Sequence, residues 1–229
     1  MSKILIVGAS SGIGEETAKM LIAEGHEVIS ASRNKPSVAL SKHLTWDASN
    51  PDDSVFAEIV ELDGIVYCPG TINLKPFSRL KTEDFQNDFQ VNVLGAINVI
   101  QANVNKLRKS SVASVVLFST VAVQTGMSFH ASVAASKGAL EGLVRSLAAE
   151  YAANGIRFNA IAPSLTKTPL ASALTSSDDK IEASNKRHPL GRIGTTEDLA
   201  NAASYLISEK SSWVTGQIFH IDGGMGSLK

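Results

Sequence analysis

The sequence of 229 residues contains a single cysteine, Cys68, which excludes an internal disulfide and a multi-cysteine metal site. The 21 Lys and Arg residues nearly balance the 22 Asp and Glu residues, and no basic block is present, so nucleic acid is not the expected partner. No hydrophobic run approaches the roughly 18 residues of a membrane span, no signal-peptide pattern opens the chain, and the histidines lack metal-ligand spacing. We therefore expect a cytoplasmic protein without a metal, acting on a small molecule and independent of membranes.

Short hydrophobic segments alternate with segments of helical periodicity along the whole chain. Strands are expected at residues 4–7, 28–31, 44–46, 64–67, 114–118, 157–161 and 217–221. Helices are expected at residues 15–24, 51–60, 82–104, 132–151 and 196–206. Continuous apolar strands separated by helices predict a parallel sheet that is covered on both faces. The fold class is therefore α/β, with one domain over residues 1–229.

Two connections break this alternation. Residues 34–43 are too few for a crossover helix of ordinary length, so we expect at most a single turn there. Residues 164–188 form a long connection rich in Ser, Thr and Leu, which predicts a lid over a substrate site, with a mobile surface loop as the alternative.

A glycine-rich loop, Gly-Ala-Ser-Ser-Gly-Ile-Gly, joins the first expected strand to the first expected helix. In such a loop the glycines permit a tight turn, a close backbone approach to a pyrophosphate, and close packing of helix on strand. The helix N-terminus adds amide donors for the phosphates. The residues expected to contact a dinucleotide here are Gly8, Ser10, Ser11, Gly12, Ile13 and Gly14. Together with the alternation, the loop predicts a Rossmann-type doubly wound parallel sheet of about seven strands.

The end of the second strand indicates which dinucleotide is bound. An acidic residue there would accept a hydrogen bond from the 2′-hydroxyl of NAD. This chain has Ser32 and Arg33 instead, a hydroxyl donor and a permanent planar cation that suit a 2′-phosphate. NADP(H) is therefore expected to be preferred over NAD(H).

The G-x-x-x-G-x-G spacing resembles the short-chain dehydrogenase/reductase family, and the resemblance continues over nearly the whole chain. It is carried by Asp47, Cys68-Pro69-Gly70, Asn92, Ser119-Thr120, Lys137 within residues 135–140, residues 159–164, and residues 189–192 and 215–224. The resemblance implies further cofactor contacts from Asp47, Ala48, Pro69, Gly70, Lys137, Pro163, Leu165 and Thr168. It also implies a homodimer or homotetramer.

The family transfers a hydride between a nicotinamide and a carbonyl carbon, using an asparagine, a serine, a tyrosine and a lysine. By resemblance, this chain supplies Asn92, Lys137 and a hydroxyl at Thr120, with Ser119 as the neighbouring alternative. The tyrosine position holds Val133, which cannot donate a proton.

His130 is a possible substitute donor, because some related enoyl reductases place their tyrosine seven residues before the lysine. On a helix, residues 130, 133 and 137 would share one face, whereas a histidine in a loop before the helix would have no such role. The sequence thus indicates an NADP(H)-dependent oxidoreductase for a small carbonyl, alcohol or enone substrate. The alternative is a catalytically impaired dinucleotide-binding protein that serves as a sensor or partner subunit.

Overall fold

Seven parallel strands form one sheet in the computed structural model, which describes residues 1–228; residue 229 of the expected domain lies outside the described part. The strands are β1 (Lys3–Val7), β2 (Glu27–Ser32), β3 (Lys42–Thr45), β4 (Gly64–Tyr67), β5 (Ser114–Phe118), β6 (Arg157–Pro163) and β7 (Ile218–Ile221). Their order across the sheet is β3-β2-β1-β4-β5-β6-β7. The predicted α/β fold and its seven strands are confirmed.

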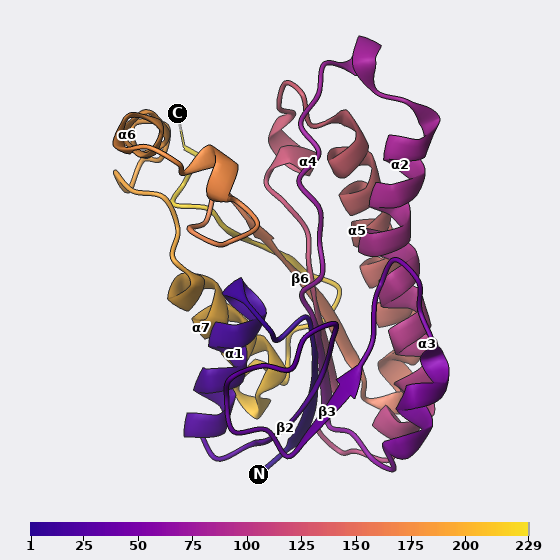
Figure 1. Cartoon of the computed structure of the whole chain (residues 1–229). Coiled ribbons are helices and arrows are strands. Elements are labelled where there is room, and N and C mark those ends of the chain that lie inside the picture. The colour runs from indigo at the N-terminus through magenta and orange to yellow at the C-terminus, as the bar shows by residue number, and fades with distance from the viewer. Residues whose placement is uncertain (229) are drawn as a thin grey trace.

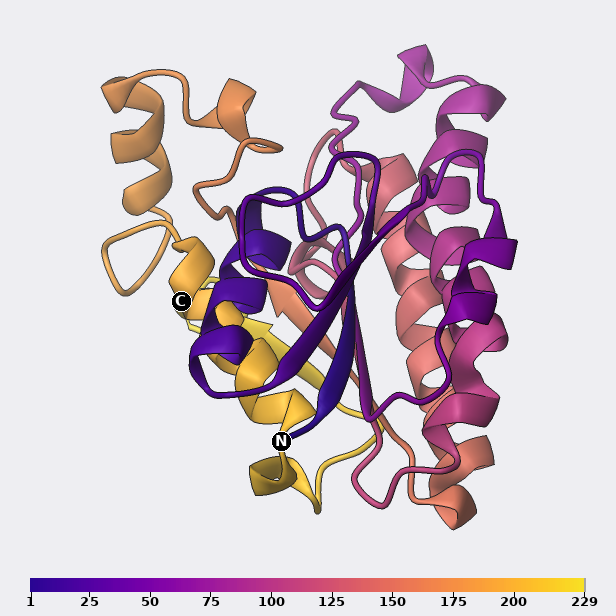
Figure 2. The same cartoon turned by 60° about the horizontal axis from the view of Figure 1, so that its bottom comes forward.

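Helices cover both faces of the sheet, as Figures 1 and 2 show. On one face lie α1 (Gly12–Ala23) and α7 (Thr196–Ile207), which contact each other. On the other lie α2 (Thr82–Phe89), α3 (Gly95–Leu107) and α5 (Ala131–Tyr151). Alternate residues of β1 divide between the two cores: Leu5 belongs to one buried cluster, and Ile4 to the other. A strand buried on both faces must be apolar throughout, which explains its continuous hydrophobic sequence.

The predicted helix over residues 51–60 is wrong. The structure has only a 3₁₀ turn there (Asp53–Glu58), begun by the Asp52 carboxylate, which accepts a hydrogen bond from the Ser54 amide. Phe56 in this turn is fully buried and packs its ring 5.8 Å from that of Trp46. One anchoring side chain and a capping carboxylate therefore cover this edge of the sheet without a full helix.

The predicted helix over residues 82–104 is interrupted. A π-helical turn (Gln90–Leu94) separates α2 from α3, and the helix extends to Leu107. The connection at residues 34–43 contains no helix, as predicted. Two short helices were not predicted: α4 (Ala122–Thr125) and α6 (Asp178–Asn185), the latter inside the expected lid.

The strand order reverses between β1 and β4, so the connections that leave these two neighbouring strands run to opposite sides of the sheet. Open α/β sheets bind ligands at such a switch point. Among residues 1–228, no helix combines the length and the hydrophobicity needed to span a bilayer.

Candidate functional site

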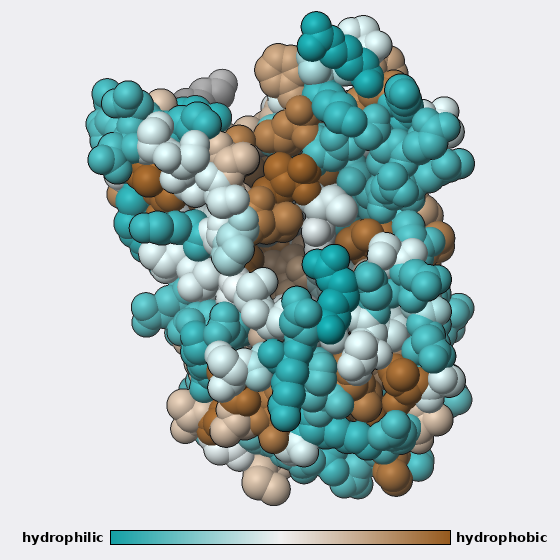
Figure 3. All heavy atoms as spheres, in the orientation of Figure 1, coloured by the Kyte–Doolittle hydropathy of each residue, from teal (hydrophilic) through white to brown (hydrophobic). Residues whose placement is uncertain are grey.

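A cleft of about 330 Å³ lies at the carboxyl ends of β1, β2 and β4. Figure 3 shows hydrophobic side chains gathered in the hollow between the part that carries α6 and the part that carries α2. The lining residues that the sequence predicted are Gly8, Ser10, Ser11, Gly12, Ile13, Gly14, Ser32, Arg33, Asp47, Ala48, Pro69, Gly70 and Thr168. Those it missed include Trp46, Ser49, Thr71, Val91, Pro169 and Leu170.

The glycine loop forms the floor of the cleft at the start of α1. Gly8 has φ +82°, a conformation that favours glycine, and its amide donates to the carbonyl of Ala31 at 2.8 Å. A Cβ on Gly14 would lie 2.9 Å from the carbonyl carbon of Gly8 and closer still to its oxygen. Any larger residue at position 14 would therefore push the helix away from the strand and open the loop.

The end of β2 presents an exposed cation to the cleft. Arg33 is exposed, whereas Ser32 is buried and its hydroxyl donates to the carbonyl of Asn34 at 2.8 Å. Asp47, across the cleft, accepts hydrogen bonds from Ser49. These bonds, with a smaller contribution from Arg33, lower the pKa of the Asp47 carboxyl. Arg33 is thus available to a ligand, whereas the Ser32 hydroxyl already has a partner.

Lys137 lies on α5 and is 6% exposed. Its Nζ donates to the carbonyl oxygen of Phe118, at the end of β5, at 2.7 Å. Burial lowers the pKa of Lys137 to about 8, although Cys68 and Asp88 oppose that effect. An amine with this pKa exchanges protons near neutral pH, which an exposed lysine does not.

Asn92 is fully buried in the π-helical turn. Its Nδ2 donates to Thr71 Oγ1 at 2.9 Å and to Ser136 Oγ at 3.1 Å. A Cβ built on Gly70 would lie 3.5 Å from Asn92 Oδ1 and 3.7 Å from Lys137 Nζ. Asn92 Oδ1 and Lys137 Nζ therefore both lie next to Gly70, a residue that lines the cleft. π-Helical turns recur at functional sites, because the wider turn re-aims one side chain.

The two hydroxyl candidates after β5 differ in their partners. Ser119 is buried, and its hydroxyl donates to the Glu141 carboxylate at 2.6 Å. Thr120 is half-buried, and its Oγ1 accepts only a long bond from the Ala122 amide at 3.3 Å. Thr120 therefore has the more available hydroxyl.

His130 lies immediately before α5, with φ −100° and ψ 13°, rather than within the helix. Of the two alternatives that the sequence left open, the one with His130 before the helix applies, because the helix begins at Ala131. The His130 ring is half-buried, and its Nδ1 bonds the carbonyl of Ser128 at 2.8 Å. Val133, in contrast, is buried one helical turn before Lys137.

The connection after β6 reaches the cleft through Thr168, Pro169 and Leu170. Three other residues expected to touch the cofactor do not line the cleft, namely Lys137, Pro163 and Leu165. Pro163 ends β6, and its carbonyl accepts the Val121 amide at 3.0 Å. Leu165 lines a separate cavity.

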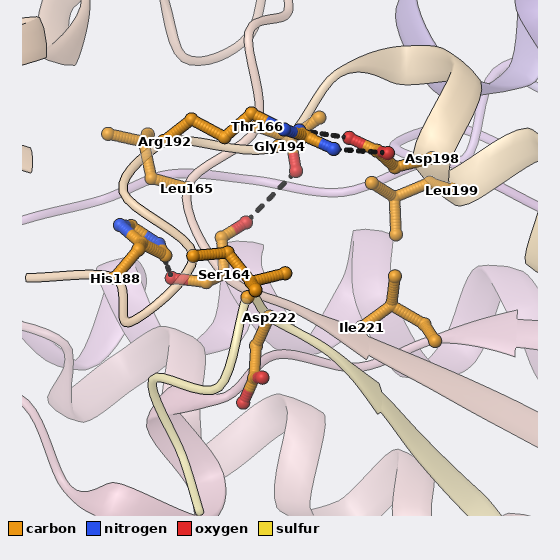
Figure 4. A pocket seen from close by; sticks show the side chains of 12 residues that line it. Ser164, Leu165, Thr166, His188, Arg192, Gly194, Asp198, Leu199, Ile221 and Asp222 are labelled. Carbon is orange, nitrogen blue, oxygen red and sulfur yellow. Dashed lines mark hydrogen bonds and ion pairs between the residues drawn. The ribbon is translucent and has the colours of Figure 1, made fainter. Parts of the chain in front are cut away.

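That second cavity, of about 100 Å³, lies between the base of this connection and the C-terminal segment (Figure 4). His188 there is almost fully buried, with Nε2 bonded to Ser164 Oγ at 2.9 Å and Nδ1 to the Ser184 carbonyl at 2.7 Å. The Asp222 carboxylate accepts the amides of Gly224 and Gly226. His188 thus links residues 164 and 184, whereas Asp222 stabilises the turn at residues 222–226, and both groups already have hydrogen-bond partners. Within residues 1–228, no cluster of side chains could hold a metal ion.

The chain is similar to known proteins over nearly its whole length. The family model described as enoyl-(acyl carrier protein) reductase matches residues 8–226. The chain belongs to the short-chain dehydrogenase/reductase family. It is 32% identical over 231 residues to the 3-oxoacyl-[acyl-carrier-protein] reductase FabG of Rickettsia bellii, an alignment that covers 96% of this chain and 95% of the relative.

Solved structures give the same result. The ligand-free aldohexose dehydrogenase of Thermoplasma acidophilum superposes with a TM-score of 0.91 at 29% identity, covering 100% of this chain and 95% of the other. The structure of ElxO with NADP bound superposes with a TM-score of 0.89 at 26% identity, and the superposition covers both chains fully. Such homologues are oxidoreductases, and members of this family bind nicotinamide dinucleotides.

Proposed function

We propose that this protein is an NADP(H)-dependent oxidoreductase that acts on a small carbonyl, alcohol or enone substrate. The observation that carries the proposal is the buried amine of Lys137, whose pKa of about 8 suits proton transfer near neutral pH. It lies beside Gly70, a residue of the cleft that the glycine loop floors.

The residues present fit a dinucleotide. The Gly8–Gly14 contact leaves no room for a side chain, so the loop offers backbone amides to a pyrophosphate. Arg33 supports a preference for NADP(H), because it is exposed at the cleft where an acid would favour NAD(H). The NADP bound by the similar ElxO agrees with this preference.

A bound reduced nicotinamide would supply the hydride, and the substrate oxygen would then need a proton. Val133 has no exchangeable proton, so we assign the donor role to the ammonium of Lys137. Thr120 would orient the substrate oxygen through its available hydroxyl. His130 fits the role less well, because it precedes the helix and its Nδ1 already bonds Ser128.

The mouth of the cleft favours an apolar substrate. Leu170 lines the cleft and is 54% exposed, and Ile72, which follows the lining residue Thr71, is 40% exposed. Partly exposed apolar side chains above a cleft stabilise a bound hydrophobic ligand. We assign residues 164–188 the role of a lid, since Thr168, Pro169 and Leu170 line the cleft.

Val133 favours a second candidate, a dinucleotide-binding protein without turnover. The deciding experiment is a screen of NADPH oxidation with ketones, aldehydes and enones, using the wild type, Lys137→Ala and Val133→Tyr. Wild-type turnover that Lys137→Ala abolishes supports the enzyme. Turnover seen only with Val133→Tyr supports the second candidate instead.

We also propose a homodimer or homotetramer. Phe89 and Leu94 remain 40% and 38% exposed on the helical layer formed by α2 and α3, which suits burial against another copy. Light scattering after size-exclusion chromatography tests this assembly, and a monomer mass would refute it.

A further inference from the structure

The π-helical turn between α2 and α3 changes the carbonyl to which the Gly95 amide donates. In an α-helix that amide would donate to the carbonyl of Val91, four residues earlier. In this structure it donates to the carbonyl of Gln90 instead. The turn therefore deprives the Val91 carbonyl of the donor that an α-helix would give it. Because backbone carbonyls inside a protein are nearly always paired, another donor is expected there.

The hydroxyl of Tyr67 supplies that donor. Tyr67 is the last residue of β4, and its hydroxyl donates to the Val91 carbonyl at 2.6 Å, a short distance for such a bond. The residue is 1% exposed, and its ring lies nearly perpendicular to that of Trp46, with 6.5 Å between the ring centroids. Burial raises the pKa of the Tyr67 phenol well above its usual value, so the hydroxyl keeps its proton at neutral pH and can donate it.

Gly95 makes room for this hydroxyl. A Cβ at position 95 would collide with the hydroxyl oxygen of Tyr67 and would lie 3.1 Å from the Cβ of Ala48. Gly95 has φ −58°, an ordinary helical value that any residue adopts. A glycine inside a helix is destabilising relative to alanine. Space for the Tyr67 hydroxyl, rather than backbone conformation, therefore explains the glycine at this position.

We propose that Tyr67 is a positioning residue for Asn92, because its hydroxyl replaces the helical amide at the Val91 carbonyl and so maintains the π-helical turn. Asn92 directly follows Val91 in that turn, and its bond to Ser136 holds the turn from the side of α5. Return of the Gly95 amide to the Val91 carbonyl would restore α-helical geometry and redirect the Asn92 side chain. Tyr67 is buried, so it acts through Asn92. Its effect on turnover rests on the proposed function, whereas the hydrogen-bond pattern does not.

The test is the crystal structure of Tyr67→Phe beside that of the wild type, both at a resolution that places the carbonyl oxygens of the turn. In the variant we expect the Gly95 amide to donate to the Val91 carbonyl, whereas in the wild type it donates to that of Gln90. Tyr151→Phe, which removes a phenol hydroxyl at the far end of α5, should leave the turn unchanged. A Tyr67→Phe structure that keeps the wild-type bond of the Gly95 amide overturns the proposal.

Gly95→Ala is the second variant, and it serves alone if Tyr67→Phe does not fold. Its methyl group would displace the Tyr67 hydroxyl from the opposite side, so it should change the turn in the same way. The double variant should add little to either single change, because both remove one interaction. Gly142→Ala makes the same substitution at an exposed position of α5 with nothing within 4 Å, and it should leave the turn intact. An intact turn in Gly95→Ala also overturns the proposal.

Kinetics separate this positioning role from a general loss of structure. In NADPH-dependent reduction, we expect Tyr67→Phe to lower kcat by about 10–10²-fold, since a misplacement of about 1 Å can cost that much. The Kd for NADPH should change little, because the glycine loop is not altered. An unchanged kcat in a variant whose turn has rearranged overturns the positioning role. A rearranged turn in a protein without any turnover supports the structural proposal and refutes only the proposed function.

Discussion

Lys137 Nζ lies 2.7 Å from the carbonyl oxygen of Phe118, so the end of β5 holds the amine of α5 in place. A backbone carbonyl cannot move without disturbing the sheet, and it cannot take up a proton. The bond therefore fixes the position of the amine while leaving its other protons directed elsewhere. Lys137 is 6% exposed, and its amine is held next to Gly70, a residue that lines the cleft.

The first prediction concerns the pH profile of reduction. If Lys137 is the proton donor, its charged form is the active one, and that form is lost as the pH rises through about 8. We expect kcat for NADPH-dependent reduction to be constant below that pH and to fall above it. Lys137→Met should reduce kcat by roughly 10²–10⁴-fold and abolish the pH dependence. A wild-type profile that stays flat to pH 10 would assign the proton to another group.

The second prediction concerns stability. The pKa of Lys137 is lower in the folded protein, about 8, than its ordinary value of 10.5. Between these two values the unfolded chain binds more protons at this site, so the contribution of Lys137 to the free energy of unfolding rises with pH. Urea unfolding at pH 7.5, 9 and 10 should show the wild type gaining stability relative to Lys137→Met. A constant difference between the two proteins would mean that the lysine titrates normally.

The third prediction concerns Val133. Its side chain lies one helical turn before Lys137 on α5, so a tyrosine there would bring a phenol toward the same part of the cleft. We expect Val133→Tyr to increase the rate of carbonyl reduction by about 10-fold or more, since a placed general acid is worth at least that. Val133→Phe is the matched control, because it adds the ring without the hydroxyl and should give no gain. Equal rates in both variants would attribute any change to shape alone.

The sequence predicted the strands better than the helices, for a physical reason. A strand buried on both faces must be apolar at every position, and β5 (Ser114–Phe118) shows this directly. The helical layer, in contrast, depends on single buried side chains and hydrogen bonds that the hydrophobic periodicity of the sequence does not reveal. Phe56 replaces a helix with a turn, and the π-helical turn at Asn92 is set by bonds to Thr71 and Ser136.

The same distinction applies to the site. The resemblance to the family implied that the glycine loop, Asn92 and Lys137 serve one site, and the structure brings Asn92 and Lys137 next to Gly70 of the cleft. The sequence left open whether His130 lies within the helix or before it, since a boundary one residue away changes the face of a side chain. The sequence analysis did not single out Asp88. An acid in an amphipathic helix is expected to be exposed, and only the packing of α2 on α5 shows that Asp88 is buried.

The fourth prediction concerns the choice of cofactor. Arg33 is exposed at the cleft, and a charge-assisted bond to a 2′-phosphate would be lost in Arg33→Ala. We expect the Kd for NADPH to rise by about 10-fold or more, and the Kd for NADH to change little. Lys109→Ala, which removes an exposed cation between α3 and the start of β5, at the opposite end of the strands from the cleft, should affect neither constant. Equal weakening of both cofactors would place Arg33 at the shared part of the dinucleotide.

The last prediction compares Gly14, which packs against the backbone of Gly8, with a glycine that has no such contact. In Gly14→Ala, the added methyl group would lie 2.9 Å from the Gly8 carbonyl carbon, so α1 must shift and the loop must open. We expect a loss of about 1–3 kcal/mol in the free energy of unfolding together with the loss of NADPH binding. Gly142→Ala is the control: it lies exposed in α5 with nothing within 4 Å of the new methyl group, and it should gain about 0.4–1 kcal/mol. Both values come from urea unfolding, and NADPH fluorescence reports binding. Retention of tight binding in Gly14→Ala would show that the cofactor does not depend on this contact between loop and helix.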